Sequence, residues 1–300
     1  MGIIKVAFIG NRVFRFISTK VLPSTLAMRL ALGLIVLIFL YMVIKYFIHK
    51  RIKTFYNPTA LNKSILENLR KRIKSYSPTF YLPHTFLKIV VMMKSKRLAN
   101  KAIYLREYVK LNDGEVIGLD MYPKNHKELE KDTPTIIFVP GLNGTSTNYY
   151  SGYLCKLCTE EHPETKFRVG VMNKRGLGGM PIVGSRITNL DIYEDLIEVV
   201  KHVSKQFHTK NIYLIGFSLG SIYVLNALQS GRLDGLVKGA SIAGCPWKWR
   251  GVLGKLKEMP FIDNRLTRKH ISLLAEHLHE PTFFGLMNKN GITEGIFSLI

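Results

Sequence analysis

The chain has 300 residues and a formal net charge of +22, and 47% of its residues are hydrophobic. That apolar share is enough for a packed core, and a charged fraction of 21% excludes a globally disordered chain. Three cysteines, an odd number in a long chain, exclude the disulfide framework of a small secreted domain.

The positive charge is concentrated in the N-terminal third of the chain. Residues 1–110 hold 21 Lys and Arg against two Glu, whereas residues 111–300 hold 22 Lys and Arg against 19 acidic residues. A local basic segment indicates a local partner with negative charge, either nucleic acid or an anionic membrane. Since the sequence carries no RRM, KH, helix-turn-helix or zinc-finger signature, we expect a membrane partner and no nucleic acid.

The first predicted element is a membrane-spanning helix. Residues 30–44 carry no charge and lie between Arg29 and Lys45. This run falls short of the roughly 20 residues that cross a bilayer, but the long side chain of Lys45 can reach the interface and extend the span to residue 48. A cleaved signal peptide and a buried helix of a soluble protein are the alternatives. Because 29 residues precede the run and no A-x-A-like site follows it, we expect a single-pass anchor over residues 30–48.

The anchor separates a short N-terminal segment, residues 1–29, from a basic connector over residues 49–100. Residues 45–110 hold 16 Lys and Arg against two Glu, and this charge predicts contact with an anionic lipid surface. The two flanks nearest the anchor carry almost the same number of basic residues and do not decide its orientation. The longer basic flank favours a C-terminal domain that faces the cytosol.

Residues 101–300 alternate between strand and helix patterns. Residues 102–110 and 116–122 flank an Asp-Gly hairpin turn signal. Further short apolar runs have the character of parallel strands that are buried on both faces, and they are residues 135–140, 168–173, 211–217 and 237–243. Amphipathic helices are expected over residues 192–207 and 219–230. This alternation predicts an α/β fold with a doubly wound, mostly parallel sheet.

The most informative motif is Gly216-Phe217-Ser218-Leu219-Gly220. It follows a predicted strand and precedes a predicted helix, which is the context that a nucleophile elbow requires. The tight turn needs glycines two residues before and after the serine and leaves the Ser218 hydroxyl exposed at the top of the sheet. An ordinary turn with a chance match is the alternative. We predict that Ser218 is the catalytic nucleophile and that the Leu219 N–H is one donor of an oxyanion hole.

A second oxyanion donor is expected in Pro140-Gly141-Leu142-Asn143-Gly144, which follows the strand at residues 135–140. Glycines here let the backbone bend toward the serine, so the Leu142 N–H is the predicted donor. No metal or cofactor is expected. Cys155 and Cys158 form a C-x-x-C, but no second pair completes a zinc site, and their spacing fits one buried face of a helix.

With these motifs in place, the chain resembles the YheT-like branch of membrane-anchored α/β-hydrolase-domain proteins, which are esterases and lipases. Besides the elbow, four stretches carry the resemblance: residues 76–83, residues 111–114 with Leu119-Asp120, residues 140–144, and Asn173-Lys174-Arg175-Gly176-Leu177-Gly178-Gly179. The resemblance implies an α/β-hydrolase fold and the hydrolysis of carboxylic esters, often acylglycerols or phospholipids. It covers roughly residues 76–250.

The resemblance places the catalytic acid and histidine after the nucleophile, and here the chain departs from the pattern. Only 82 residues follow Ser218, and none of the acids or histidines among them ends a predicted late strand. Residues 247–286 are expected to form a lid, and the candidates fall within it: Asp263, His270, His277 and His279. We therefore expect a poorly activated serine. The chain is either a truncated copy of a longer enzyme, whose sheet is incomplete at the C-terminus, or a membrane-tethered pseudo-hydrolase that acts by binding.

Overall fold

A computed structural model describes residues 24–47, 53–72, 102–160, 166–182 and 193–248, with single positions between 79 and 91 and between 251 and 268. The chain divides into two compact units, Met1–Lys96 and Arg97–Ile300. Several predictions lie outside the described residues: the N-terminal segment up to residue 23, most of the stretch at 76–83, most of the lid, and the acid and base candidates Asp263, His270, His277 and His279.

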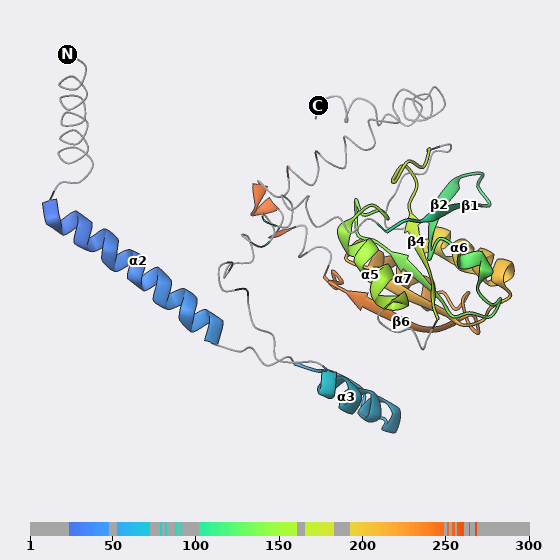
Figure 1. The fold of residues 1–300 in the computed structure, drawn as a ribbon, viewed down its shortest axis with the longest axis horizontal. Helices are drawn as coiled ribbons and strands as arrows, with labels where there is room; N and C mark the ends of the chain where they lie inside the picture. The colour runs from blue at the N-terminus through green and yellow to red at the C-terminus, as the bar shows by residue number, and fades with distance from the viewer. Residues whose placement is uncertain are drawn as a thin grey trace, which may run out of the picture. The chain divides into compact units, whose positions relative to one another are not determined.

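The described residues of the first unit form two helices, α2 (Ser24–Phe47) and α3 (Ala60–Arg72) (Figure 1). α2 has 24 residues and is roughly 36 Å long at 1.5 Å per residue, which exceeds the roughly 30 Å of a bilayer core. The prediction of an apolar N-terminal helix is confirmed, and the helix begins six residues before the charge-free run, so it includes Arg29. Its apolar window Ala27–Ile44 has no buried residue. Among the described residues, α2 alone is long and apolar enough to cross a membrane.

In the part of the second unit that the structure describes, six strands form one sheet with the order β1-β2-β4-β3-β5-β6. β1 pairs antiparallel with β2, and β2 pairs antiparallel with β4, whereas the pairs β4–β3, β3–β5 and β5–β6 are parallel. The strands are β1 (Leu105–Lys110), β2 (Val116–Tyr122), β3 (Thr135–Val139), β4 (Arg168–Asn173), β5 (Ile212–Phe217) and β6 (Val237–Ala243). The predicted fold class is confirmed. The first strand begins at Leu105 rather than at residue 102, where its pairing with Met121 of β2 starts.

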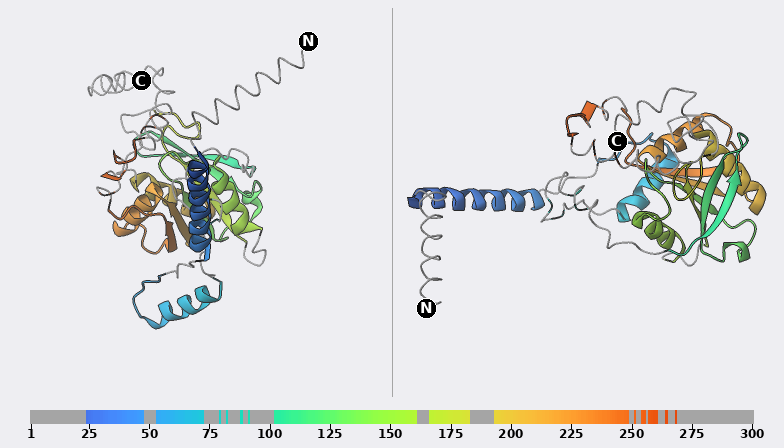
Figure 2. Two further views of the ribbon diagram at one scale, coloured as in Figure 1. Left: turned by 90° about the vertical axis from the view of Figure 1, so that its left-hand side faces the viewer. Right: turned by 90° about the horizontal axis from the view of Figure 1, so that it is seen from above.

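Helices cover both faces of this sheet (Figure 2). On one face, α6 (Tyr193–Phe207) and α7 (Leu219–Gln229) pack over a core that includes Ile137 and Val139 of β3. On the other face, α5 (Tyr149–Thr159) covers Ile136 and Phe138 of the same strand. Successive side chains of a strand point to opposite faces, so a strand that is buried on both faces must be apolar throughout, as β3 is. A short 3-10 helix, η2 (His126–Glu128), lies between β2 and β3.

Cys155 is fully buried in the core beneath α5, and Cys158 packs against the same core. Both thiols are free, and burial raises the pKa of Cys155 to about 12. The prediction that this C-x-x-C serves core packing is confirmed. Among the described residues, no cluster of His, Cys, Asp or Glu could hold a metal ion.

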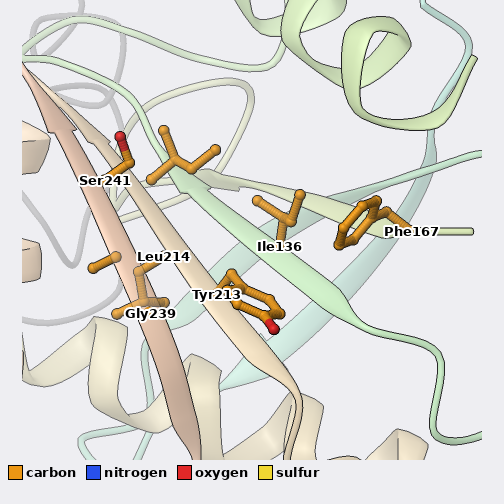
Figure 3. Close-up of a pocket in the computed structure, with 8 residues that line it drawn as sticks. Ile136, Phe167, Tyr213, Leu214, Gly239 and Ser241 are labelled. Carbon is orange, nitrogen blue, oxygen red and sulfur yellow. The ribbon is translucent and has the colours of Figure 1, made fainter. Parts of the chain in front are cut away.

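The α5 face of the sheet also carries an apolar groove of about 370 Å3 between β3, β5 and β6 (Figure 3). Ile136, Phe167 and Tyr213 lie on one side of it, and Gly239 and Ser241 on the other. Its lining reaches no further along β5 than Ile215, whereas the predicted nucleophile follows the last residue of that strand. The groove is therefore distinct from the candidate site described next.

Candidate active site

Ser218 occupies the single position between the end of β5 and the start of α7. Its φ is 53° and its ψ is −118°, a conformation that costs a non-glycine residue on the order of 1–3 kcal/mol. The Ser218 N–H donates to the Ala243 carbonyl at 2.8 Å, and the Ser218 carbonyl accepts from the Ser221 N–H at 3.0 Å. The predicted strand-turn-helix context is present, and two backbone hydrogen bonds hold the serine in its strained position.

The two glycines of the motif are required by close backbone contacts. A Cβ atom on Gly216 would lie 2.6 Å from the Gly220 carbonyl oxygen and 2.8 Å from the Cα atom of Ser221. A Cβ atom on Gly220 would overlap the Val139 carbonyl oxygen at the end of β3. The elbow is therefore pressed against both the first turn of α7 and the end of the neighbouring strand, and any side chain at these positions would push the elements apart.

Ser221 adds a hydrogen bond that the sequence did not single out. Its hydroxyl is fully buried and lies 2.9 Å from the Gly216 carbonyl oxygen and 3.1 Å from that of Ala243. It therefore ties the first turn of α7 to the carboxyl ends of both β5 and β6. A serine three residues after the predicted nucleophile gives no distinctive sequence signal, because its partners are backbone atoms that the fold brings together.

The loop after β3 lies beside Ser218. A Cβ atom on Gly141 would lie 3.2 Å from the Cβ atom of Ser218 and 3.8 Å from its hydroxyl oxygen. The Gly144 N–H closes the loop with a hydrogen bond of 3.0 Å to the Gly141 carbonyl. The elbow and this loop are thus neighbours in the fold. The sequence predicted that both belong to one site.

The two predicted oxyanion donors directly follow the residues in contact: Leu142 follows Gly141, and Leu219 follows Ser218. Leu219 is the first residue of α7, so its N–H has no acceptor within the helix, and the positive end of the helix dipole lies there. No hydrogen bond joins the Leu142 N–H to a backbone carbonyl among the described residues. That both amides reach one substrate oxygen stays a prediction.

Lys174, directly after β4, lies beneath the same loop. Its side chain is fully buried, and its ammonium nitrogen lies 2.6 Å from the Gly141 carbonyl oxygen, 3.2 Å from that of Pro140 and 3.4 Å from that of Gly144. Burial lowers the pKa of Lys174 to about 7. In the sequence, Lys174 stands out only within the stretch at residues 173–179 that resembles the YheT-like branch, because a lone lysine gives no sign that it is buried.

The far end of the loop is held by a polar cluster around Asp120. The Arg106 guanidinium donates to both carboxylate oxygens of Asp120, at 2.6 and 2.7 Å, and Asn173 donates at 2.9 Å. The Ser146 hydroxyl donates to the same carboxylate, and the Ser146 N–H donates to the Asn173 side chain at 3.0 Å. Burial opposes the ionisation of Asp120, but these hydrogen bonds outweigh it and lower the pKa of that carboxyl.

Arg175 forms a second polar cluster, with Asp195 on α6 and Asp113 in the hairpin turn. It is buried and donates to both carboxylate oxygens of Asp195 on α6, at 2.6 and 2.7 Å. Its remaining nitrogen donates to Asp113 in the hairpin turn at 2.6 Å. The residues from Asn173 to Arg175 therefore link β4 to the loop after β3, to the hairpin and to α6.

A catalytic base for Ser218 is not found in the part of the chain that the structure describes. His126 is buried and lies 2.9 Å from the Glu107 carboxylate, through its Nε2 atom. His202 lies on α6 and His208 follows that helix, and neither forms a hydrogen bond with Ser218 in the described ranges. The base and the acid stay unassigned.

No family model matches the chain, but individual proteins do. Protein abhd-3.2 of Caenorhabditis elegans is 26% identical over 190 residues, which make up 63% of this chain and 49% of the nematode protein. Phospholipase ABHD3 of Mus musculus is 33% identical over 128 residues, which make up 42% of this chain and 30% of the mouse protein. The chain thus spans about half the length of the first relative and less than a third of the second.

Among solved structures, alpha/beta hydrolase domain-containing protein 10 from mouse is 16% identical, with a TM-score of 0.35 over 46% of this chain and 48% of that protein. No functional inference follows from a likeness at this level. The names of the sequence relatives support the α/β-hydrolase family, as the motifs predicted. They do not distinguish the YheT-like branch within it.

Proposed function

We propose that this protein is a membrane-anchored serine hydrolase of the YheT-like branch that cleaves carboxylic esters, of the acylglycerol or phospholipid type. The observation that carries the proposal is Ser218 itself: a non-glycine residue at a φ of 53°, fixed between β5 and α7, with the Gly141 loop against its side chain. Strained residues of this kind cluster at functional sites. The printed name of the mouse relative, a phospholipase, supports the substrate class.

In the proposed reaction the Ser218 hydroxyl attacks the ester carbonyl and loses its proton to a base. Negative charge then develops on the carbonyl oxygen, and the N–H groups of Leu142 and Leu219 stabilise it. Among the described residues no base, and no acid that would orient it, is assigned. The hydrolase domain over residues 101–300 would face the cytosol, held at its lipid substrate by the anchor at residues 30–48 and by the basic connector.

A fluorophosphonate probe tests the proposal, because it phosphonylates an activated serine. We expect slow labelling of the full-length chain that is abolished in the Ser218→Ala variant. Slow labelling is expected because none of the described histidines forms a hydrogen bond with Ser218, while an oxyanion hole alone retains part of the catalysis. A Ser230→Ala variant is the matched control: it removes the hydroxyl of an exposed serine after α7 and should leave labelling at Ser218 unchanged. Equal labelling of wild type and Ser218→Ala would contradict the proposal.

The alternative is a membrane-tethered pseudo-hydrolase that binds a lipid or ester without cleaving it. It is favoured by one observation: none of the described histidines forms a hydrogen bond with Ser218. Binding without cleavage predicts no phosphonylation at Ser218 under any condition, together with saturable binding of a non-hydrolysable ether lipid. A chain that both binds the ether lipid and reacts at Ser218 is a hydrolase.

A further inference from the structure

Two basic residues, Lys174 and Arg175, follow β4, and their buried side chains have different kinds of partner. Arg175 forms ion pairs with two carboxylates, Asp195 and Asp113. Lys174 is equally buried, but within the described ranges no carboxylate pairs with it, and its hydrogen bonds go only to backbone carbonyls. An amine buried without an opposite charge is costly, so its position calls for an explanation.

All three carbonyls belong to the loop after β3, and each belongs to a peptide plane. In a trans peptide the C=O and the next N–H point in opposite directions. The Gly141 carbonyl, 2.6 Å from the Lys174 nitrogen, shares its plane with the Leu142 N–H. When Lys174 fixes the direction of that carbonyl, it also fixes the Leu142 N–H, which must point away from the lysine.

Apart from Lys174, one internal hydrogen bond defines the direction of the Gly141 carbonyl among the described residues. Two of the loop's five residues, Gly141 and Gly144, have no side chain, and glycine backbones rotate more freely than others. Its internal hydrogen bond joins the Gly144 N–H to the Gly141 carbonyl, which therefore accepts from two donors. At its far end the loop is held through Ser146 and Asn173, outside the peptide that carries the predicted oxyanion donor.

We propose that Lys174 is a positioning residue for the oxyanion loop: by binding the carbonyl oxygens of Pro140, Gly141 and Gly144 it orients the Leu142 N–H toward the substrate oxygen at Ser218. The proposal rests on the proposed function, since it assigns a task within that site. Burial lowers the pKa of Lys174 to about 7. The ammonium form has three N–H donors, one for each of the three carbonyls.

The test compares Lys174→Met with Lys174→Gln in the full-length protein. Methionine keeps the length of the side chain without a donor, whereas glutamine keeps two N–H donors. The readout is the rate at which a fluorophosphonate reacts with Ser218, separated into the maximal rate and the probe concentration that gives half of it. We expect the maximal rate of Lys174→Met to fall about 10- to 100-fold at an unchanged half-saturating concentration, because only the charged transition state loses a donor. Lys174→Gln should retain more of the rate than Lys174→Met.

Lys205→Met, an exposed position on α6, is the control and should react at the wild-type rate. A Lys174→Met variant that reacts as fast as wild type would overturn the proposal. So would equal loss in the methionine and glutamine variants accompanied by an equal fall in melting temperature, since that pattern belongs to a lysine that only stabilises the fold.

Amide hydrogen exchange separates this proposal from the proposed function. In Lys174→Met, or in Lys174→Gln where the methionine variant does not fold, we expect faster exchange over residues 141–145 and unchanged exchange over β2. If wild type does not react with the probe at Ser218, the hydrolase proposal fails for this chain, and the exchange experiment still decides whether Lys174 holds the loop. Unchanged exchange over residues 141–145 refutes it.

Discussion

The two units of this protein differ in which side chains they expose and which they bury. In α2, leucines such as Leu30 and Leu37 are 66% and 63% exposed, and no residue of its apolar window is buried. In the sheet unit, by contrast, Lys174, Arg175 and Asp195 are 0–2% exposed. In the first unit the apolar side chains of α2 are exposed, as the proposed membrane anchor requires. The second satisfies its charges internally, and the charges then fix where loops and helices lie.

The helix α3 extends this contrast. Leu61, Ile65 and Leu69 recur at every fourth residue and are 43–70% exposed, so they form an apolar stripe along one side. Lys63, Arg70 and Lys71 lie on the remaining circumference. A basic helix with an exposed apolar stripe is typical of segments that lie in the plane of a membrane interface. The following predictions test the contrast from its largest expected effect to its smallest.

Placing charge in α2 should have the largest effect. Replacing both Leu34 and Leu37 by lysine puts two charges at the centre of the span, at about 3 kcal/mol each on insertion scales. After carbonate extraction, wild type should remain with the membranes and the double variant should be released. Tyr153→Lys, at an exposed position on α5, should remain membrane-bound. Release of wild type itself would show that α2 is not an anchor.

Removing Arg175 tests the buried charges. Arg175→Met removes the ion pairs with Asp195 and Asp113, and breaking a buried pair such as that with Asp195 costs about 3–5 kcal/mol. Urea denaturation should show this loss. The exposed pair of Arg232 with Glu194, at 3.6 Å, provides the control, and Arg232→Met should cost less than about 1 kcal/mol. Equal effects of the two substitutions would mean that burial of the pair does not matter.

The buried carboxyl of Glu107 should make the free energy of unfolding depend on pH. Burial opposes its ionisation, but hydrogen bonds from His126 and Gln206 outweigh it and lower the pKa of Glu107 to about 2. Because the folded-state pKa lies below the unfolded one, the stabilisation is complete above about pH 4.5 and is lost as the pH falls toward 2, by on the order of 3 kcal/mol. Glu107→Gln should flatten the dependence of unfolding free energy on pH in this window. An unchanged slope would refute the assignment.

The basic connector should give the smallest effects. A chain that lacks residues 1–44 should bind phosphatidylserine vesicles at low salt and detach at high salt, at about 1 kcal/mol per basic residue. In that background Lys63→Gln should weaken binding by about fivefold, and Ile65→Asn should weaken it at both salt concentrations, because the apolar contact is not screened. Equal binding to neutral vesicles would contradict an electrostatic role.

The sequence predicted what depends on local pattern. Each of the four parallel strands was visible as a short apolar run, and the position of Ser218 followed from two glycines and their flanking elements. The prediction that residues 237–243 are buried on both faces was wrong: β6 has no buried residue, because it lies at the edge of the described sheet. The contacts of Lys174 with residues about 30 positions earlier could not be predicted, because a lysine is charged whether it is exposed or buried. Ser221 was missed for a related reason: its acceptors are carbonyls at the ends of two strands that meet only in the folded sheet. The helix α2 begins six residues before the charge-free run, because a helix continues through Arg29.

The backbone at Ser218 carries one more consequence, which concerns protein engineering. A serine with a φ of 53° and a ψ of −118° has a strained backbone, and this strain lowers the free energy of unfolding. Glycine adopts such a conformation at little cost, so Ser218→Gly should yield a more heat-resistant protein that has lost the hydroxyl. Selection for thermostability alone would therefore favour loss of the proposed nucleophile, and a library designed to stabilise this fold must keep position 218 fixed.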